Sequence, residues 1–66
     1  MSVAKIIEIS SDSKTSFQDA IESGIKRAEQ TLKNVKGAWI AEQKISVSKG
    51  KISSYRVIMR VSFIID

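Results

Sequence analysis

Residues 52–65 read ISSYRVIMRVSFII, and this stretch decides the fold. Its odd-numbered positions are apolar without a break from Tyr55 to Ile65, whereas its even-numbered positions mix serine, arginine and isoleucine. Successive side chains of a strand point to opposite faces, so the odd-numbered residues share one face of a sheet. The pattern predicts a long strand at residues 52–65 whose continuous apolar face lies against the core.

Two further strands are predicted upstream of this stretch. Residues 38–47 are joined to it by the polar turn Ser48-Lys49-Gly50-Lys51, an arrangement typical of a β-hairpin. Residues 3–10 are crowded with β-branched side chains and end in a polar run, which is also typical of a strand. Because the apolar residues of this first strand fall on both faces, we expect both faces to be covered.

A helix is predicted between the first two strands. Apolar residues recur there at spacings of three and four, which places them on one face of a helix. The stripe consists of Phe17, Ala20, Ile21, Gly24, Ile25, Ala28, Leu32 and Val35. Thr15 and Gln18 have the spacing of a capping box, so we expect the helix to begin near Ser16. Gly24 costs about 1 kcal/mol relative to alanine in a helix, and it either allows another element to approach closely or is a tolerated defect.

These elements define a single α+β domain, residues 1–66, with β-α-β-β order. A crossover helix leaves the first two strands parallel, and the hairpin makes the third antiparallel to the second. If the third strand inserts between the other two, every neighbouring pair is antiparallel and its apolar face lies over the helix. We therefore expect a three-stranded antiparallel sheet of order 1-3-2, wrapped on one helix.

A chain of this size needs copies of itself. A domain of 66 residues buries only about 60% of the surface that its unfolded chain exposes, and the sequence has no cysteine or histidine for disulfides or a zinc site. One helix covers one face of the sheet, which leaves Ile6, Ile58 and Ile64, with either Trp39 or Ile40, on the other face. Large exposed apolar patches are rare on monomers, so we expect a symmetric homo-oligomer.

The composition favours a binding protein over an enzyme. The sequence has no histidine, no cysteine, no glycine-rich phosphate loop and no metal-ligand spacing, so we predict neither catalysis nor a metal site within one chain. Eleven lysines and arginines give a net charge of +4 without forming a block, which makes a basic nucleic-acid-binding oligomer an alternative that we do not favour. Neither a secretory signal nor a membrane-spanning run is apparent, and we expect a cytoplasmic location without a membrane partner.

Five segments together resemble the dodecin family. They are residues 3–9 (VAKIIEI), 15–21 (TSFQDAI), 27–35 (RAEQTLKNV), Glu42-Gln43 and 55–63 (YRVIMRVSF). The resemblance implies a hollow homododecamer of cubic symmetry that stores or sequesters flavins such as riboflavin or FMN without reacting with them. It also implies that a tryptophan at the start of the second strand stacks on the flavin and that a glutamine in the third strand hydrogen-bonds it.

The sequence departs from this family pattern at both flavin-contacting positions. Ungapped alignment through Glu42 and Gln43 places Gly37 at the stacking position and Arg56 at the hydrogen-bonding position. Gly37, Trp39, Glu42, Gln43 and Arg56 are therefore the candidate ligand-contacting residues. We expect a non-catalytic dodecin-like shell for small ligands whose flavin site is altered or lost.

For two of these residues, Trp39 and Arg56, the sequence allows either a ligand-binding or a structural role. Trp39, two residues after Gly37 and so on the same face of a regular strand, either offers a shifted stacking surface for a flavin or anchors a subunit contact. We favour the subunit contact. Arg56 either holds a phosphate or carboxylate of a ligand such as FMN, or pairs with Glu8 or Glu42 across a subunit boundary, and we favour the ion pair. Some family members with arginine here are linked to calcium, so a cation on a symmetry axis is a further possibility.

Overall fold

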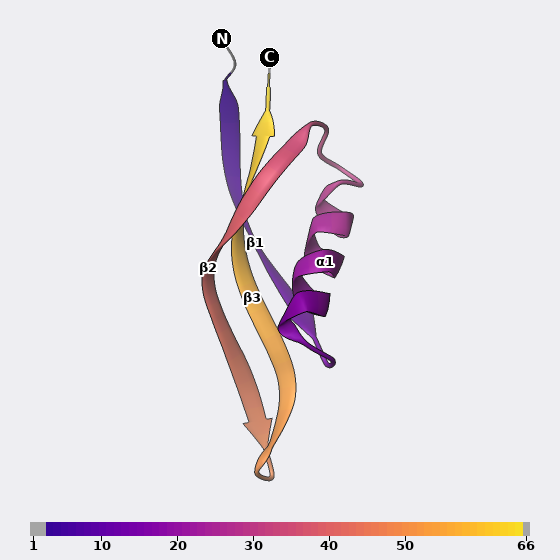
Figure 1. Ribbon diagram of the computed structural model, residues 1–66, viewed down its shortest axis with the longest axis vertical. Coiled ribbons are helices and arrows are strands. Elements are labelled where there is room, and N and C mark those ends of the chain that lie inside the picture. The colour runs from indigo at the N-terminus through magenta and orange to yellow at the C-terminus, as the bar shows by residue number, and fades with distance from the viewer. Residues whose placement is uncertain (1–2, 66) are drawn as a thin grey trace.

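The computed structural model describes residues 3–65, which form one helix and a three-stranded sheet (Figure 1). The elements are β1 (Ala4–Ser13), α1 (Phe17–Ala28), β2 (Val35–Ser48) and β3 (Lys51–Ile64). The strand order is β1-β3-β2, and both neighbouring pairs are antiparallel. The predicted β-α-β-β order and the central position of the third strand are confirmed.

The core lies between α1 and the odd-numbered face of β3. Val57, Met59 and Val61 are fully buried there, and Ala20 and Ala28 are the buried apolar residues of the helix. The helix packs against β1 and β3. The predicted contact between the helix stripe and the apolar face of residues 52–65 is therefore confirmed.

The helix begins with a cap one residue later than predicted. Ser16, not Thr15, is the cap residue, and its side chain accepts a hydrogen bond from the Asp19 amide at 2.9 Å. The buried Ser13 hydroxyl donates to the Asp19 carboxylate at 2.6 Å and accepts from the Thr15 amide at 2.9 Å. Ser13 belongs to β1, which continues three residues beyond the predicted end, so this network joins the strand directly to the helix.

The helix is also shorter than its apolar stripe suggested. It ends at Ala28, and Leu32 and Val35 lie outside it. The backbone tightens there, because the Thr31 amide donates to the Ala28 carbonyl at 3.1 Å and the Thr31 hydroxyl approaches the same carbonyl at 3.4 Å. Asn34 then takes a left-handed conformation with φ of 61°, and the chain turns into β2.

The hairpin turn is tighter than the predicted four-residue segment. Ser48 pairs with Lys51, which leaves a two-residue loop. Lys49 and Gly50 both have positive φ, 53° and 76°, as a type I′ turn requires. The twist of this turn matches the right-handed twist of the two long strands. The hairpin extends beyond the helix toward the lower end of Figure 1.

The chain is elongated, with principal extents of 51 × 19 × 13 Å. Its radius of gyration is 13.6 Å, compared with about 11 Å for a compact domain of this length. Residues Lys36 to Ser48 of β2 are all exposed, and Ile6 of β1 is exposed as well, as expected for the sheet face that the helix does not cover. Within residues 3–65, the single helix lacks the length and apolar content to cross a membrane.

Of the two alternatives left open for Gly24, the structure favours a close approach, and this can be tested. A Cβ atom there would lie 2.7 Å from Met59 Cε and 3.0 Å from Ser11 Cβ. We expect Gly24→Ala to lower the free energy of unfolding by about 1–2 kcal/mol, because overpacking outweighs the gain in helix propensity. The measurement is thermal or denaturant unfolding at fixed protein concentration.

Gly37→Ala is the matched control for this substitution. A Cβ at Gly37 would meet Ser62 Oγ at 3.7 Å, an ordinary contact distance. The control should therefore unfold at or above the midpoint of the unchanged protein. Equal stability of the two variants would show that the helix can move away from β3 at no cost.

Candidate functional site

The candidate residues gather mainly on the sheet face that points away from α1, which we call the distal face. It consists of the even-numbered residues of β1 and β3 and of the β2 residues paired with them, because directly paired residues share a face. Read from β1 through β3 to β2, four rows cross it: Ile6–Ser62–Gly37, Glu8–Arg60–Trp39, Ser10–Ile58–Glu42 and Asp12–Arg56–Lys44.

Trp39 lies on the distal face, and Ile40 does not. Trp39 pairs with Arg60 of the distal face, whereas Ile40 pairs with Met59, whose side chain is in the core. The register therefore selects Trp39 from the two alternatives left open by the sequence. It also places Gly37, which pairs with Ser62, on the same face as Trp39, as predicted.

The register separates Glu42 from Gln43. A bulge lies between Ile40 and Glu42, and it returns Glu42 to the distal face beside Trp39. Gln43 pairs with the buried Val57 and so belongs to the opposite face. Gln43 therefore lies apart from the other four candidates within one chain, and its role as a ligand contact stays a prediction.

Gly37 presents no side chain to a ligand. Its carbonyl accepts a hydrogen bond from the Ser62 hydroxyl at 3.2 Å, and its backbone has no positive φ. A side chain at this position would enter open space apart from the Ser62 contact. The aromatic surface that stacks on flavin in the family pattern is therefore missing at this position.

Arg56 is held by an acid that the sequence analysis did not identify. Its guanidinium donates twice to the Asp12 carboxylate, from Nε to Oδ1 at 2.7 Å and from Nη2 to Oδ2 at 3.1 Å. Glu8 is paired within the chain with Arg60, whose Nε lies 3.2 Å from Glu8 Oε2. The predicted partners of Arg56 were Glu8 and Glu42, and neither contacts it within one chain.

The Asp12–Arg56 pair shifts the protonation equilibria of both groups. The hydrogen bond from Arg56 lowers the pKa of Asp12 below its ordinary value, and the charges of Arg56 and Lys44 act in the same direction. The hydrogen bond to Asp12 raises the pKa of Arg56. Arg56 thus stays positively charged, and the two donors with which it could bind a ligand carboxylate or phosphate already bind Asp12.

Gly37 and Arg56 are far apart within one chain. Gly37 pairs with Ser62, and Arg56 lies six residues away from Ser62 along β3, which corresponds to roughly 20 Å in an extended strand. A single flavin ring cannot reach both positions of one copy. A ligand that contacts both positions must therefore bind between two copies.

Comparison with known proteins agrees with the residue pattern. A family model described as Dodecin matches residues 3–66. The chain belongs to the dodecin family. Among relatives of this dodecin, the calcium dodecin of Mycobacterium tuberculosis is 39% identical over 64 residues, which are 96% of this chain and 89% of the relative.

Solved structures confirm the dodecin fold. A dodecin from Streptomyces davaonensis superposes with a TM-score of 0.93 at 31% identity, covering 98% of this chain and 96% of that one. The M. tuberculosis calcium dodecin, described as a calcium-chelating antigen with a novel calcium-binding site, superposes with a TM-score of 0.83 at 34% identity. That match covers 97% of this dodecin and 91% of the relative.

Sequence reasoning missed Asp12 of β1 and considered Glu8 only as a partner of Arg56, not of Arg60. Glu8 and Asp12 are far in sequence from their arginine partners, and only the register between β1 and β3 reveals that they face Arg60 and Arg56. The charged residues at even-numbered positions of β1 and of β3 were the pattern from which these pairs could have been predicted. Among residues 3–65, no three acids come close enough within one chain to hold a metal ion.

The electrostatic coupling of Asp12 and Arg56 can be tested by titration. We expect Arg56→Gln to raise the pKa of Asp12 toward its ordinary value of 3.8, because the dominant hydrogen bond is lost. Lys44→Gln, the matched control, should raise it less, because Lys44 acts only through its charge. Carboxyl-carbon NMR of Asp12 across the acid range measures both effects.

The same pair gives stability a defined pH dependence. Since the pKa of Asp12 is lowered in the folded state, its contribution is fully present above the ordinary value of 3.8 and is lost as pH falls through the lowered pKa. The stability difference between the unchanged protein and Arg56→Gln should therefore narrow in strong acid. A difference that stays constant into strong acid would contradict this assignment.

Proposed function

We propose that this dodecin is the subunit of a closed homododecameric shell that binds or stores small ligands and catalyses no reaction. The proposal is carried by the exposure of β2. This strand is exposed from Lys36 to Ser48 on both faces, including large apolar side chains. A strand in this state is unusual in a folded monomer, and copies of the same chain supply the missing cover.

The exposed apolar side chains lie on two different surfaces. Trp39 and Ile6 belong to the distal face, and they are 45% and 52% exposed. Ile40 and Ile45 line the opposite face of β2, beyond the reach of the helix, and are 39% and 44% exposed. Covering both surfaces requires contacts with more than one neighbour, which supports a closed assembly over a simple dimer.

We further propose that the usual flavin site is altered in this shell. Gly37 supplies no stacking ring, and Arg56 is engaged by Asp12. These residues do not fit the aromatic sandwich of flavin-binding dodecins. The proposed cargo is therefore a small ligand held by other groups, and the proposed compartment is the cytoplasm.

Flavin sequestration is a second candidate function, favoured by the position of Trp39. Its side chain is 45% exposed on the same face as Gly37, one row away along the sheet. An indole in this position offers a stacking surface displaced from the usual one. Under this alternative, Trp39 replaces the missing aromatic residue for riboflavin or FMN.

A cation is a third ligand class, suggested by the calcium dodecin relative. One chain does not fit this role by itself, because residues 3–65 contain no group of three neighbouring acids. Calcium usually takes six to eight oxygen ligands. A site for it would need acids from several copies around a symmetry axis.

Native mass spectrometry tests the assembly. We expect a particle of twelve chains of 7.3 kDa each. Ile45→Asp should shift the protein toward smaller species, because it places a charge on an apolar surface, exposed in the single chain, that the proposed assembly would bury. Lys26→Glu, on the exposed side of α1, is the control and should keep the full assembly.

A monomer or dimer for the unchanged protein would overturn the proposed shell. Retained flavin in the spectrum would favour the second candidate function instead. The folded state of each variant is checked by circular dichroism, so that loss of assembly is distinguished from loss of fold.

Restoring the stacking residue tests the altered flavin site. We expect Gly37→Trp to bind riboflavin at least about tenfold more tightly than the unchanged protein, because base-like rings stacked on aromatic side chains gain about 1–3 kcal/mol. Quenching of riboflavin fluorescence measures the affinity. Tight binding by the unchanged protein that is lost in Trp39→Ala would support the Trp39 alternative.

A further inference from the structure

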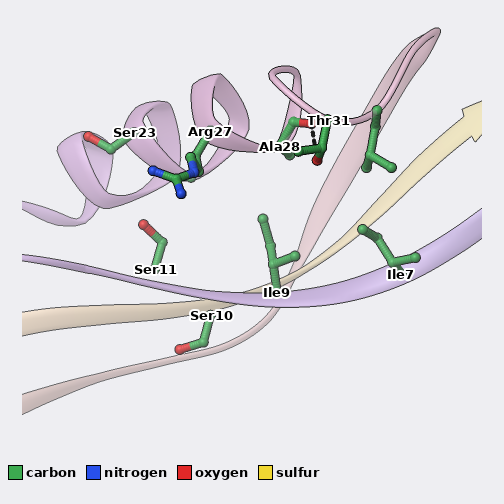
Figure 2. A pocket seen from close by; sticks show the side chains of 10 residues that line it. Ile7, Ile9, Ser10, Ser11, Ser23, Arg27, Ala28 and Thr31 are labelled. Atoms are coloured by element: carbon green, nitrogen blue, oxygen red, sulfur yellow. Dashed lines mark hydrogen bonds between the residues drawn. The ribbon is translucent and has the colours of Figure 1, made fainter.

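A concave surface lies on the helix side of β1, between this strand and α1. It is a groove of about 360 Å³ formed by residues of β1, of α1 and of the turn that follows the helix. Figure 2 shows Ile7 and Ile9 rising from β1 toward the helix, with Ser11 further along the same strand. The groove is complete within one chain, and none of the five candidate residues named from the sequence lines it.

The floor of the groove is apolar and its rim is polar. Ile7, Ile9, Ala28 and Leu32 provide most of the apolar lining. The rim carries Ser11, Ser23, Arg27 and Thr31. Small-molecule sites typically combine such a floor with a few polar groups in a volume of about 300–1,000 Å³, and this groove is at the lower end of that range.

Arg27 is the charged group of the groove, and it has no acid partner in the described chain. The arginines of β3, Arg56 and Arg60, both have a carboxylate across the strand. The Arg27 guanidinium forms no hydrogen bond or ion pair with residues 3–65. In Figure 2 its guanidinium extends over the groove between Ser23 and Ser11.

The neighbours of Arg27 explain why it is unpaired. Positions three and four residues away on a helix are its nearest surface neighbours, and here they are Ser23, Gly24, Gln30 and Thr31. None of them is acidic. The β1 acids Glu8 and Asp12 face the distal side, where each is paired with its own arginine.

We propose that this groove binds a small anionic molecule with an apolar body. The anionic group, a carboxylate, sulfonate or phosphate, pairs with the Arg27 guanidinium, for which bidentate geometry is available. The apolar body lies on Ile7, Ile9 and Leu32. The volume suits a body of one to three rings or a short hydrocarbon chain.

The proposal is independent of the shell and of the flavin site. The groove lies on the helix side of β1, whereas the candidate flavin-contacting residues Gly37, Trp39 and Arg56 lie on the distal face. Its lining comes from a single chain, so binding does not require the assembly. If the proposed shell or its altered flavin site were disproved, the proposed groove site would be unaffected. Likewise, a groove that binds no anion would not contradict the proposed function.

Binding of 8-anilinonaphthalene-1-sulfonate to the intact protein tests the proposal. This probe combines a sulfonate with an apolar aromatic body, and its fluorescence rises in apolar surroundings. We expect saturable binding, with Arg27→Gln weakening it about tenfold to a hundredfold, as for loss of a hydrogen bond to a charged group. Arg27→Lys should retain part of the affinity. Lys26→Gln is the matched control, with the same change of charge at a neighbouring exposed position.

Two further measurements locate the probe and isolate the role of charge. In methyl NMR of the isoleucine-labelled protein, the probe should shift the signals of Ile7 and Ile9 but not those of Ile45 and Ile58. The neutral analogue N-phenyl-1-naphthylamine should bind the unchanged protein and Arg27→Gln equally. Absence of saturable binding, equal sulfonate affinity in Arg27→Gln, or shifts confined to Ile45 and Ile58 would each overturn the proposal.

Discussion

The packing of α1 against the odd-numbered face of β3 is the interaction on which the remaining structure depends. It buries Val57, Met59 and Val61 completely, and Gly24 lets the helix come close enough for Met59 to lie against its backbone. A helix of twelve residues, Phe17–Ala28, has no further surface with which to cover β2. Both the small core and the large exposed surface follow from this single contact.

Much of the fold could be predicted from the spacing of apolar residues, because the strands and the helix each repeat them with a different period. The uninterrupted odd-numbered apolar face of residues 55–65 predicted the central strand, and together with the crossover and hairpin rules it predicted the strand order. The end of the helix could not be predicted in the same way, because Leu32 continues the apolar stripe after the backbone has tightened at Thr31. The cap was displaced by one residue because Ser13, a strand residue, holds the amide of Thr15.

The candidate site was harder to predict, because it depends on the register between strands rather than on spacing within one strand. Alternation alone could not assign Trp39 or Ile40 to a face, since β2 contains bulges. It also could not identify Asp12 as the partner of Arg56, because the two residues are 44 positions apart in the sequence. The structure shows that β1 neutralises the arginines of β3 on one face and leaves Arg27 unpaired on the other.

In the proposed shell, the bulges of β2 have a consequence for the size of the particle. The extra residues are Lys36 and Ala41, since the register skips both while the pairs on either side keep their faces. Each extra residue bends and twists the strand, and a curved subunit surface sets the radius at which copies close. Deleting either residue would flatten β2 without turning Gly37, Trp39 or Glu42 to the opposite side. In the proposed shell, the radius of the particle and the chemistry of its surfaces would thus be encoded by separate positions of the same strand.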